Sequence, residues 1–257
     1  MIVDAAERFA AMLALAFLRY LPPIVLPGLT PLRWAPPMVR IVLALGLAWL
    51  TVLAMPQEAI VGPAPRATAW ITAAAGELLI GLIFGLVLMI PQAALHTAGW
   101  LVDVQAGLSA GTLFNPGGQG DVQSLLGAAL MLAGTVLFFT LDLHLDLYRA
   151  LVASTRVIPV GQAGAGLDLA AFLGLLGSSF LLGLVVVMPV VLALLSVDIG
   201  IAYAMRSMPQ ANVYFLMLPL KVMVALLVMV ATLPLVPAML ERLFRDAFTR
   251  VPSMLGV

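Results

Sequence analysis

The stretch "GELLIGLIFGLVL", residues 76–88, places one acid, Glu77, in an otherwise apolar run and spaces Gly81 and Gly85 four residues apart. A G-x-x-x-G pair lets two helix backbones approach closely, so the stretch predicts a helix packed tightly against another. A carboxylate inside an apolar segment is costly and is a functional-site hypothesis by default. Two interpretations of Glu77 stay open: a carboxylate inside an assembly interface or pore, or a glutamate at a helix end whose side chain extends to water.

The composition shows that much of the chain lies in apolar surroundings. Of its 257 residues, 63% are hydrophobic and 9% are charged, whereas a soluble domain is roughly half apolar and about a quarter charged. A water-soluble fold of this size cannot hide so much apolar surface, so membrane lipid or partner subunits must cover it. We therefore expect one all-α integral-membrane domain over residues 1–257, with no soluble domain at either end.

Charge and cysteine content exclude several other classes of protein. The formal net charge is zero, so nothing suggests a nucleic-acid partner, and the absence of cysteine excludes disulfides and thiolate metal sites. Acids near the start, followed by Arg19 and paired prolines, favour a retained first membrane segment over a cleaved signal peptide.

Six regions are candidate membrane helices, since a crossing takes about 20 apolar residues. They are residues 7–27, 38–55, 69–110, 122–141, 169–197 and 213–236. Pro189, Pro219 and Pro234 lie inside the last two, and proline kinks a helix by removing a hydrogen bond. Broken, tilted helices packed against neighbours are therefore at least as well supported as six straight crossings. If every region does cross, the arginine distribution favours both termini in the cytoplasm.

The string "TLDLHLDLYRAL", residues 140–151, suggests a metal site or proton relay, but helical geometry argues against it. At about 100° per residue, Asp142, Asp146 and Arg149 share a face and His144 lies opposite. We expect Arg149 to offset the two carboxylates.

The signatures of phosphate loops, zinc proteases and serine hydrolases are missing. We therefore expect no catalytic residue, no metal site and no cofactor.

Two further stretches carry polar groups into apolar surroundings. "MPQANVYFLMLPLKVMVALLV", residues 208–228, has a turn ending at Asn212 and then places Pro219 and Lys221 inside an apolar helix. Lys221 must extend to water, pair with an acid or face a wet cavity. "GTLFNPGGQGD", residues 111–121, lacks the lysine of a phosphate loop. It is either a connector between two helices or a working part of the protein.

Four stretches resemble the FliR family of bacterial type III export-gate proteins. "PQANVYFLMLPLKV" (209–222) is similar to the family's Pro-x-x-Asn-Val-aromatic turn and Leu-Pro-Leu-Lys helix. The others are "GELLIGLIFGLVL" (76–88), "GWLVDVQAGLSAGTLFNP" (99–116) and "LHLDLYRALVASTRVIPVG" (143–161). Their order and spacing fit the family over essentially the whole chain. Asp142 and Leu143 depart from the Asn-Gly that often precedes the family's histidine, and Asp146 is an added acid.

The resemblance implies a multi-pass protein of the bacterial inner membrane, in the flagellar basal body. It implies a hetero-oligomeric gate with FliP-like and FliQ-like subunits and an FlhB-like subunit around the entrance. Exported unfolded proteins would pass through that gate, and membrane lipid would contact it. Helices of the family form hairpins that rise above the membrane plane rather than flat crossings.

The resemblance also implies functional residues, in a loop that helps to close the pore and at intramembrane polar positions that serve assembly. The loop matches Gly107, Gly111, Leu113, Phe114, Asn115, Pro116, Gly117, Gly118, Gly120 and Asp121. The polar and assembly positions are Glu77, Gln105, Arg149, Asn212, Pro219 and Lys221.

We therefore expect a subunit of the type III export gate, with the flagellar branch favoured over the injectisome. "IPVG" (158–161) is typical of the flagellar branch and "DVQAG" (103–107) of the virulence branch. The alternative is a stand-alone secondary transporter or ion channel that uses Glu77, Asp142 or Lys221 in a coupled site. A membrane-embedded enzyme is less well supported, because no nucleophile–base pair is evident.

Overall fold

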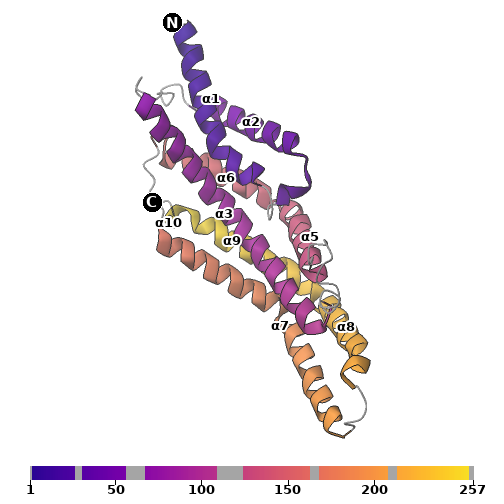
Figure 1. Cartoon of the computed structure of the whole chain (residues 1–257). Helices are drawn as coiled ribbons and strands as arrows, with labels where there is room; N and C mark the ends of the chain where they lie inside the picture. Colours follow the sequence, from indigo (N-terminus) through magenta and orange to yellow (C-terminus); the bar gives the residue numbers. More distant parts are fainter. Residues whose placement is uncertain are drawn as a thin grey trace. The chain divides into compact units, whose positions relative to one another are not determined.

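The computed structural model describes residues 2–26, 31–55, 67–108, 124–162, 168–207 and 213–254. All regular structure in these ranges is helical, which confirms the all-α fold class (Figure 1). The α-helices are α1 (Ile2–Val25), α2 (Pro37–Ala54), α3 (Ala67–Ala106), α5 (Leu125–Thr140), α6 (Leu143–Val157), α7 (Leu169–Ser207), α8 (Val213–Thr232), α9 (Val236–Thr249) and α10 (Val251–Met254). Short 3-10 helices cover Pro31–Trp34 and Leu233–Leu235.

Each of the six apolar regions forms helix, but they are not six equivalent spans. Within the described residues, five stretches are long and apolar enough to cross a membrane: Ala6–Val25, Pro37–Ala54, Thr68–Ala106, Leu169–Arg206 and Met217–Thr249. Helix α5 has only 16 residues. It counts as a sixth span only when it is joined with α6, from which a sharp bend separates it.

The longest helices exceed what one perpendicular crossing needs. Helix α3 has 40 residues and α7 has 39. At 1.5 Å per residue each is about 60 Å long, whereas the hydrocarbon core of a bilayer is about 30 Å thick. Both helices continue through a proline, Pro91 in α3 and Pro189 in α7. The helical interruption near the C-terminus falls instead at Pro234, in the 3-10 helix between α8 and α9.

The chain divides into two compact units, and α3, α5, α7 and α9 each contribute residues to both. Unit 1 comprises Met1–Ile90, Phe138–Leu176 and Phe244–Val257, and unit 2 comprises Pro91–Leu137 and Gly177–Leu243. Each unit has an apolar core of its own. A single domain over residues 1–257 stays a prediction.

The core of unit 1 forms where α1, α2, α3, α6 and the end of α9 bury apolar side chains. Its largest buried side chains include Met12, Tyr20, Phe84, Leu151 and Phe244. The glycine pair of α3 faces α1, as the G-x-x-x-G spacing predicts. A Cβ at Gly81 would overlap the carbonyl oxygen of Arg19, and one at Gly85 would lie 2.9 Å from Cδ1 of Leu26.

The core of unit 2 collects residues from α3, α5, α7, α8 and α9. Leu95, Leu130, Val187, Leu194 and Leu240 are among its buried members. Two glycines bring α3 and α5 together there, since a Cβ at Gly99 would overlap the backbone of Gly127. Small residues at such crossings allow the close helix contacts typical of membrane proteins.

The glycine packing of unit 1 predicts opposite effects for two alanine substitutions. Gly81→Ala should lower the free energy of unfolding by about 1–3 kcal/mol, because the new methyl group meets the backbone of α1. Gly46→Ala in α2 is the matched control: nothing lies within 4 Å of its Cβ position, so the variant should gain roughly 0.5–1 kcal/mol of helix propensity. Denaturant titration in detergent micelles measures both, and equal values for the two variants would contradict the packing.

Candidate functional site

The central polar group of unit 1 is an ion pair between Arg19 of α1 and Glu77 of α3. Nε of Arg19 lies 2.6 Å from Oε2 of Glu77, Nη2 donates to Oε1 at 3.0 Å, and both side chains are fully buried. Two parallel bonds between a guanidinium and a carboxylate give the strongest and most directional form of this contact. The interpretation of Glu77 as a helix-end residue extending to water is therefore wrong.

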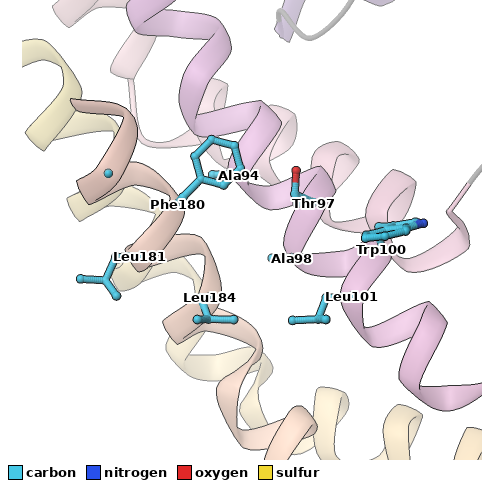
Figure 2. A pocket seen from close by; sticks show the side chains of 9 residues that line it. Ala94, Thr97, Ala98, Trp100, Leu101, Phe180, Leu181 and Leu184 are labelled. Atoms are coloured by element: carbon cyan, nitrogen blue, oxygen red, sulfur yellow. The ribbon is translucent and has the colours of Figure 1, made fainter. Parts of the chain in front are cut away.

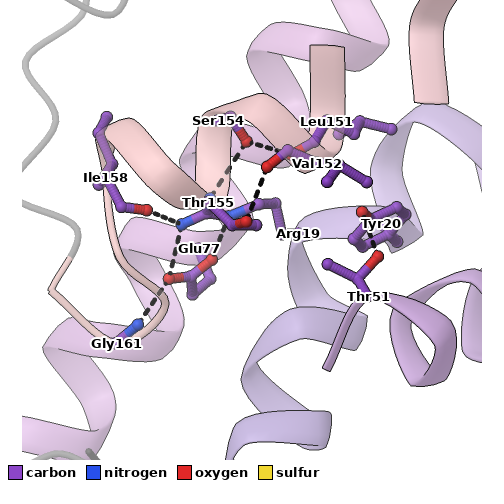
Figure 3. Close-up of polar contacts among 10 residues, drawn as sticks. All are labelled: Arg19, Tyr20, Thr51, Glu77, Leu151, Val152, Ser154, Thr155, Ile158 and Gly161. Carbon is purple, nitrogen blue, oxygen red and sulfur yellow. Dashed lines mark hydrogen bonds and ion pairs between the residues drawn. The ribbon is translucent and has the colours of Figure 1, made fainter. Parts of the chain in front are cut away.

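Three further hydrogen bonds connect the pair to α6 and the turn that follows it (Figure 3). Arg19 donates from Nη1 to Oγ of Ser154 at 3.1 Å and from Nη2 to the carbonyl oxygen of Ile158 at 3.0 Å. The backbone N–H of Gly161, a residue with φ 86°, donates to Oε1 of Glu77 at 2.8 Å. Every nitrogen of the guanidinium and both carboxylate oxygens have partners, so the network joins three segments of the chain.

A second ion pair lies in unit 2, between Lys221 of α8 and Asp198 of α7. Nζ of Lys221 lies 2.7 Å from Oδ1 of Asp198, and the two side chains are 7% and 43% exposed. Of the alternatives for Lys221, pairing with an acid is the one that the structure shows. Asp198 was not singled out from the sequence, although it follows from the same rule, since a base in an apolar helix requires an acid nearby.

A third buried polar group joins the end of α3 to the start of α5. Oγ of Ser124 donates to Oδ2 of Asp103 at 2.6 Å, and the N–H of Leu126 donates to the same oxygen at 3.1 Å. The N–H of Gly127 donates in turn to Oγ of Ser124 at 2.7 Å. Asp103 and Ser124 thus cap the N-terminus of α5, where unpaired N–H groups require acceptors.

The loop proposed to close the pore lies mostly outside the described residues. Its first member, Gly107, has φ 79°, and a Cβ there would lie 3.3 Å from the side chain of Leu218 in α8. Gln105, in the last turn of α3, has a buried Oε1 without a hydrogen-bond partner in the described part of the chain. The remaining members fall outside the described ranges, as does Asn212: Gly111, Leu113, Phe114, Asn115, Pro116, Gly117, Gly118, Gly120 and Asp121.

The region around Arg149 differs from the expected polar face. Nη1 of Arg149 lies 2.9 Å from Oδ1 of Asp146, and the arginine side chain is 73% exposed. Among the described carboxylates only this one pairs with it, so the expectation that Arg149 offsets two carboxylates is wrong. The reason is local. The shared face was predicted for one continuous helix, but Asp142 precedes α6 with a left-handed backbone, φ 57°, and so lies outside that helix.

The other expected positions add no reactive centre. Pro219 is exposed within α8, and His144 packs beside Phe139, with ring centroids 5.4 Å apart. Within the described ranges no group of three His, Asp or Glu side chains could hold a metal ion. The polar groups that the structure brings together are therefore pairs and caps.

An apolar groove of unit 2 lies between α3 and α7 and has a volume of about 440 Å³ (Figure 2). It is lined by Ala94, Thr97, Ala98, Trp100, Leu101, Gly177, Phe180, Leu181 and Leu184. Elsewhere α7 and α8 expose large apolar side chains, among them Ile199 and Leu227. Apolar surface of this extent requires lipid or another subunit to cover it.

These features define a class: an all-helical membrane protein with several spans, in which Glu77 and Lys221 are each paired within the described part of the chain. Comparison with known proteins then specifies the family. The family described as "Bacterial export proteins, family 1" matches residues 10–247. The flagellar biosynthetic protein FliR of Escherichia coli K12 is 31% identical over 183 residues, which cover 70% of this chain and 69% of that protein.

Two more relatives extend the comparison. FliR of Aquifex aeolicus is 33% identical over 176 residues, covering 68% of this chain and 67% of the relative. The Yop proteins translocation protein T of Yersinia pestis is 31% identical over 157 residues, covering 60% of each chain. The chain belongs to the bacterial export proteins of family 1, the family of FliR. It is thus a multi-pass membrane component of the type III export apparatus, whose members work in complexes with other subunits.

The buried pair of unit 1 predicts a large cost for removing one charge. Glu77→Gln leaves the Arg19 guanidinium buried without its carboxylate, which should lower the free energy of unfolding by about 3–5 kcal/mol. The double variant Arg19→Met/Glu77→Leu removes both charges and should lose less than the sum of the single variants. Denaturant titration in detergent micelles measures the cycle.

The exposed pair supplies the control for that cycle. Asp146→Asn should leave stability unchanged, because water already screens the Arg149–Asp146 contact. Wild-type stability in Glu77→Gln would show that the Arg19–Glu77 pair does not hold unit 1 together.

Proposed function

We propose that the chain forms part of the channel of the type III export gate, which passes unfolded proteins across the bacterial inner membrane. We place it in the flagellar branch, because the FliR relatives from E. coli and Aquifex align with a larger share of the chain than the Yersinia translocation protein does. The proposed partners are FliP-like and FliQ-like subunits of a hetero-oligomeric gate, and an FlhB-like subunit.

The observation that carries the proposal is the placement of the buried charges. A stand-alone transporter with a coupled ion site needs Glu77, Asp142 or Lys221 open to an ion. Glu77 is instead enclosed by Arg19 and Gly161 in unit 1, and Lys221 pairs with Asp198 in unit 2. Asp142 is exposed at the start of α6. Glu77 and Lys221 are thus both occupied in structural pairs, which supports a gate subunit over the transporter.

Helix length and exposed surface also support the gate. Helices α3 and α7, each about 60 Å long, suit hairpins that rise above the membrane plane. The exposed apolar side chains of α7 and α8 suit burial against neighbouring subunits and lipid. The ion pair between Asp198 of α7 and Lys221 of α8 joins the same two helices. The pair therefore fixes the α7–α8 hairpin that such neighbours would contact.

The segment after α3 is the proposed closure of the channel. Glycine-rich backbone adopts many conformations, and Leu113 and Phe114 would supply an apolar seal against water. This role comes from the family resemblance and from the sequence of residues 107–121. Gly107, at the described edge of the segment, already adopts the left-handed backbone that glycine accepts without strain.

Complementation of a null strain tests the function and the Lys221 pair together. The wild-type chain should restore type III export and co-purify with FliP-like and FliQ-like subunits. Lys221→Met should reduce assembly or export, because Asp198 loses its cation, and the exchange Lys221→Asp/Asp198→Lys should recover part of the loss. Normal export by the null strain would reject the function, and wild-type export by Lys221→Met would reject a role for the pair.

Deleting Gly117 to Gly120 tests the closure. The shortened loop should leave assembly intact but make the resting complex permeable to small ions, measured as conductance in planar bilayers. The chain offers a matched control in a second glycine-rich stretch, Ala163 to Gly166, whose deletion should leave the conductance at the wild-type level. Unchanged conductance in assembled complexes that lack residues 117–120 would refute the closure.

A further inference from the structure

Unit 1 has an apolar groove of its own, between α3, α6 and the C-terminal helices. Its volume is about 390 Å³, and Phe84 of α3 and Phe248 of α9 are among the residues that line it. Small-molecule sites in proteins occupy roughly 300–1,000 Å³ and have mostly apolar walls. The groove is therefore large enough to hold a ligand, and its lining favours an apolar one.

One wall of this groove is a face of α6. Ala150, Ala153, Ser154 and Val157 line it, and their spacing of three and four residues places them on one side of the helix. Ala153 is exposed and Val157 is 55% exposed, so this side of the groove reaches the surface of the chain. A hydrocarbon chain can therefore enter the groove from outside.

The groove also borders the network around Arg19 and Glu77. Ser154 is a lining residue, and its Oγ accepts a hydrogen bond from Nη1 of Arg19 at 3.1 Å (Figure 3). Water in the groove would weaken the ion pair, because a high dielectric constant screens charges. An apolar occupant excludes that water and keeps the surroundings of the pair at a low dielectric constant. Hydrocarbon in the groove therefore stabilises the central polar group of unit 1.

A cation at the rim of the groove indicates the rest of the ligand. Arg156 is exposed in the last turn of α6 and lies about 60° around the helix from Ala153. Helical side chains lean toward the helix N-terminus, so we expect its guanidinium beside Ala153. Among the described residues no carboxylate pairs with Arg156. It is therefore available to an anion outside the chain.

Two other arginines near the groove already have acidic partners. Arg149, on the same side of α6, pairs with Asp146 at 2.9 Å, and Arg250, at the end of α9, pairs with Asp246 at 3.1 Å. The C-terminus of α6 contributes about half a negative charge, which is less than the full positive charge of Arg156. A net positive charge thus remains beside the apolar groove, which matches an anion that carries a hydrocarbon chain.

We propose that this groove binds one anionic phospholipid, with an acyl chain along α6 and the phosphate group at Arg156. Such a site differs from the general lipid coat of a membrane protein, because it holds one chain in a groove and selects the charge of the headgroup. The proposal rests on unit 1 and on the membrane location of the chain, and it does not depend on the proposed role in an export channel.

Lipid titration of the full-length chain, purified in detergent, tests the site. The probes are phosphatidylglycerol and phosphatidylethanolamine with the same acyl chains, and native mass spectrometry counts the lipids bound. Phosphatidylglycerol should bind about fivefold more tightly, as one arginine near a membrane surface predicts. It should also raise the midpoint of thermal unfolding, because it binds the folded chain. Equal affinity for the two lipids would overturn the site.

Removing the cation tests the headgroup contact. Arg156→Gln should weaken binding of phosphatidylglycerol about fivefold, to the level of phosphatidylethanolamine. Arg8→Gln is the matched control, since Arg8 is also exposed but lies on α1 and does not line the groove. Its affinity should stay at the wild-type value. An equal loss in both variants would show attraction to the overall charge and would reject the site.

Filling the groove tests the position of the acyl chain. Ala153→Phe should weaken binding of both lipids at least about tenfold, because the new ring takes the place of buried hydrocarbon. Ala202→Phe, at an exposed position of α7, should bind both lipids as the wild type does. If Ala153→Phe does not fold, Arg156→Gln and the comparison of the two lipids still decide. Wild-type lipid affinity in a folded Ala153→Phe variant that no longer co-purifies with partner subunits would assign the groove to a protein and overturn the lipid. Wild-type affinity with normal co-purification would equally reject the groove as the lipid site.

Discussion

The structure depends on one constraint: a charge placed inside an apolar helix must find its partner inside the protein. Arg19 and Glu77 satisfy this constraint in unit 1, 58 residues apart in sequence and joined by two hydrogen bonds. Because the guanidinium also binds Ser154 and Ile158, the pair determines how α1, α3 and α6 meet. The glycines of α3 then allow α1 to approach closely enough for those bonds to form.

The same constraint gives the buried charges of this chain a structural role. Charges that a transporter would use for ions are committed here to holding helices, Glu77 in unit 1 and Lys221 in unit 2. What remains for partners is apolar surface on long helices, which suits a protein that works as one subunit of a larger assembly. The proposed role in an export gate agrees with this arrangement.

Much of the fold and part of the site followed from patterns along the chain. Runs of about 20 apolar residues identified every long helix, and the spacing of Gly81 and Gly85 indicated a tight helix crossing. The exclusion of a shared metal site at Asp142 and His144 rested on helical geometry. That geometry did not anticipate the left-handed residue at Asp142, because a single turn residue leaves no periodic signal. Asp103, Ser124 and Asp198 were missed because each gains meaning only from a residue on another helix.

The sequence by itself determined that the chain lies in apolar surroundings, that it is helical and to which family it belongs. Composition, hydrophobic run length and local motifs are properties of neighbouring residues. Only the tertiary structure decided which charged side chains form ion pairs. Glu77 could have faced a pore, a partner or water, and its fully buried contact with Arg19 depends on helices far apart in sequence. Likewise the sequence showed a glycine-rich segment after α3, but only the fold showed that Asp103 binds the residue that follows that segment. Pairing across helices is a long-range property, and the physical cost of a buried, unpaired charge is what selects it.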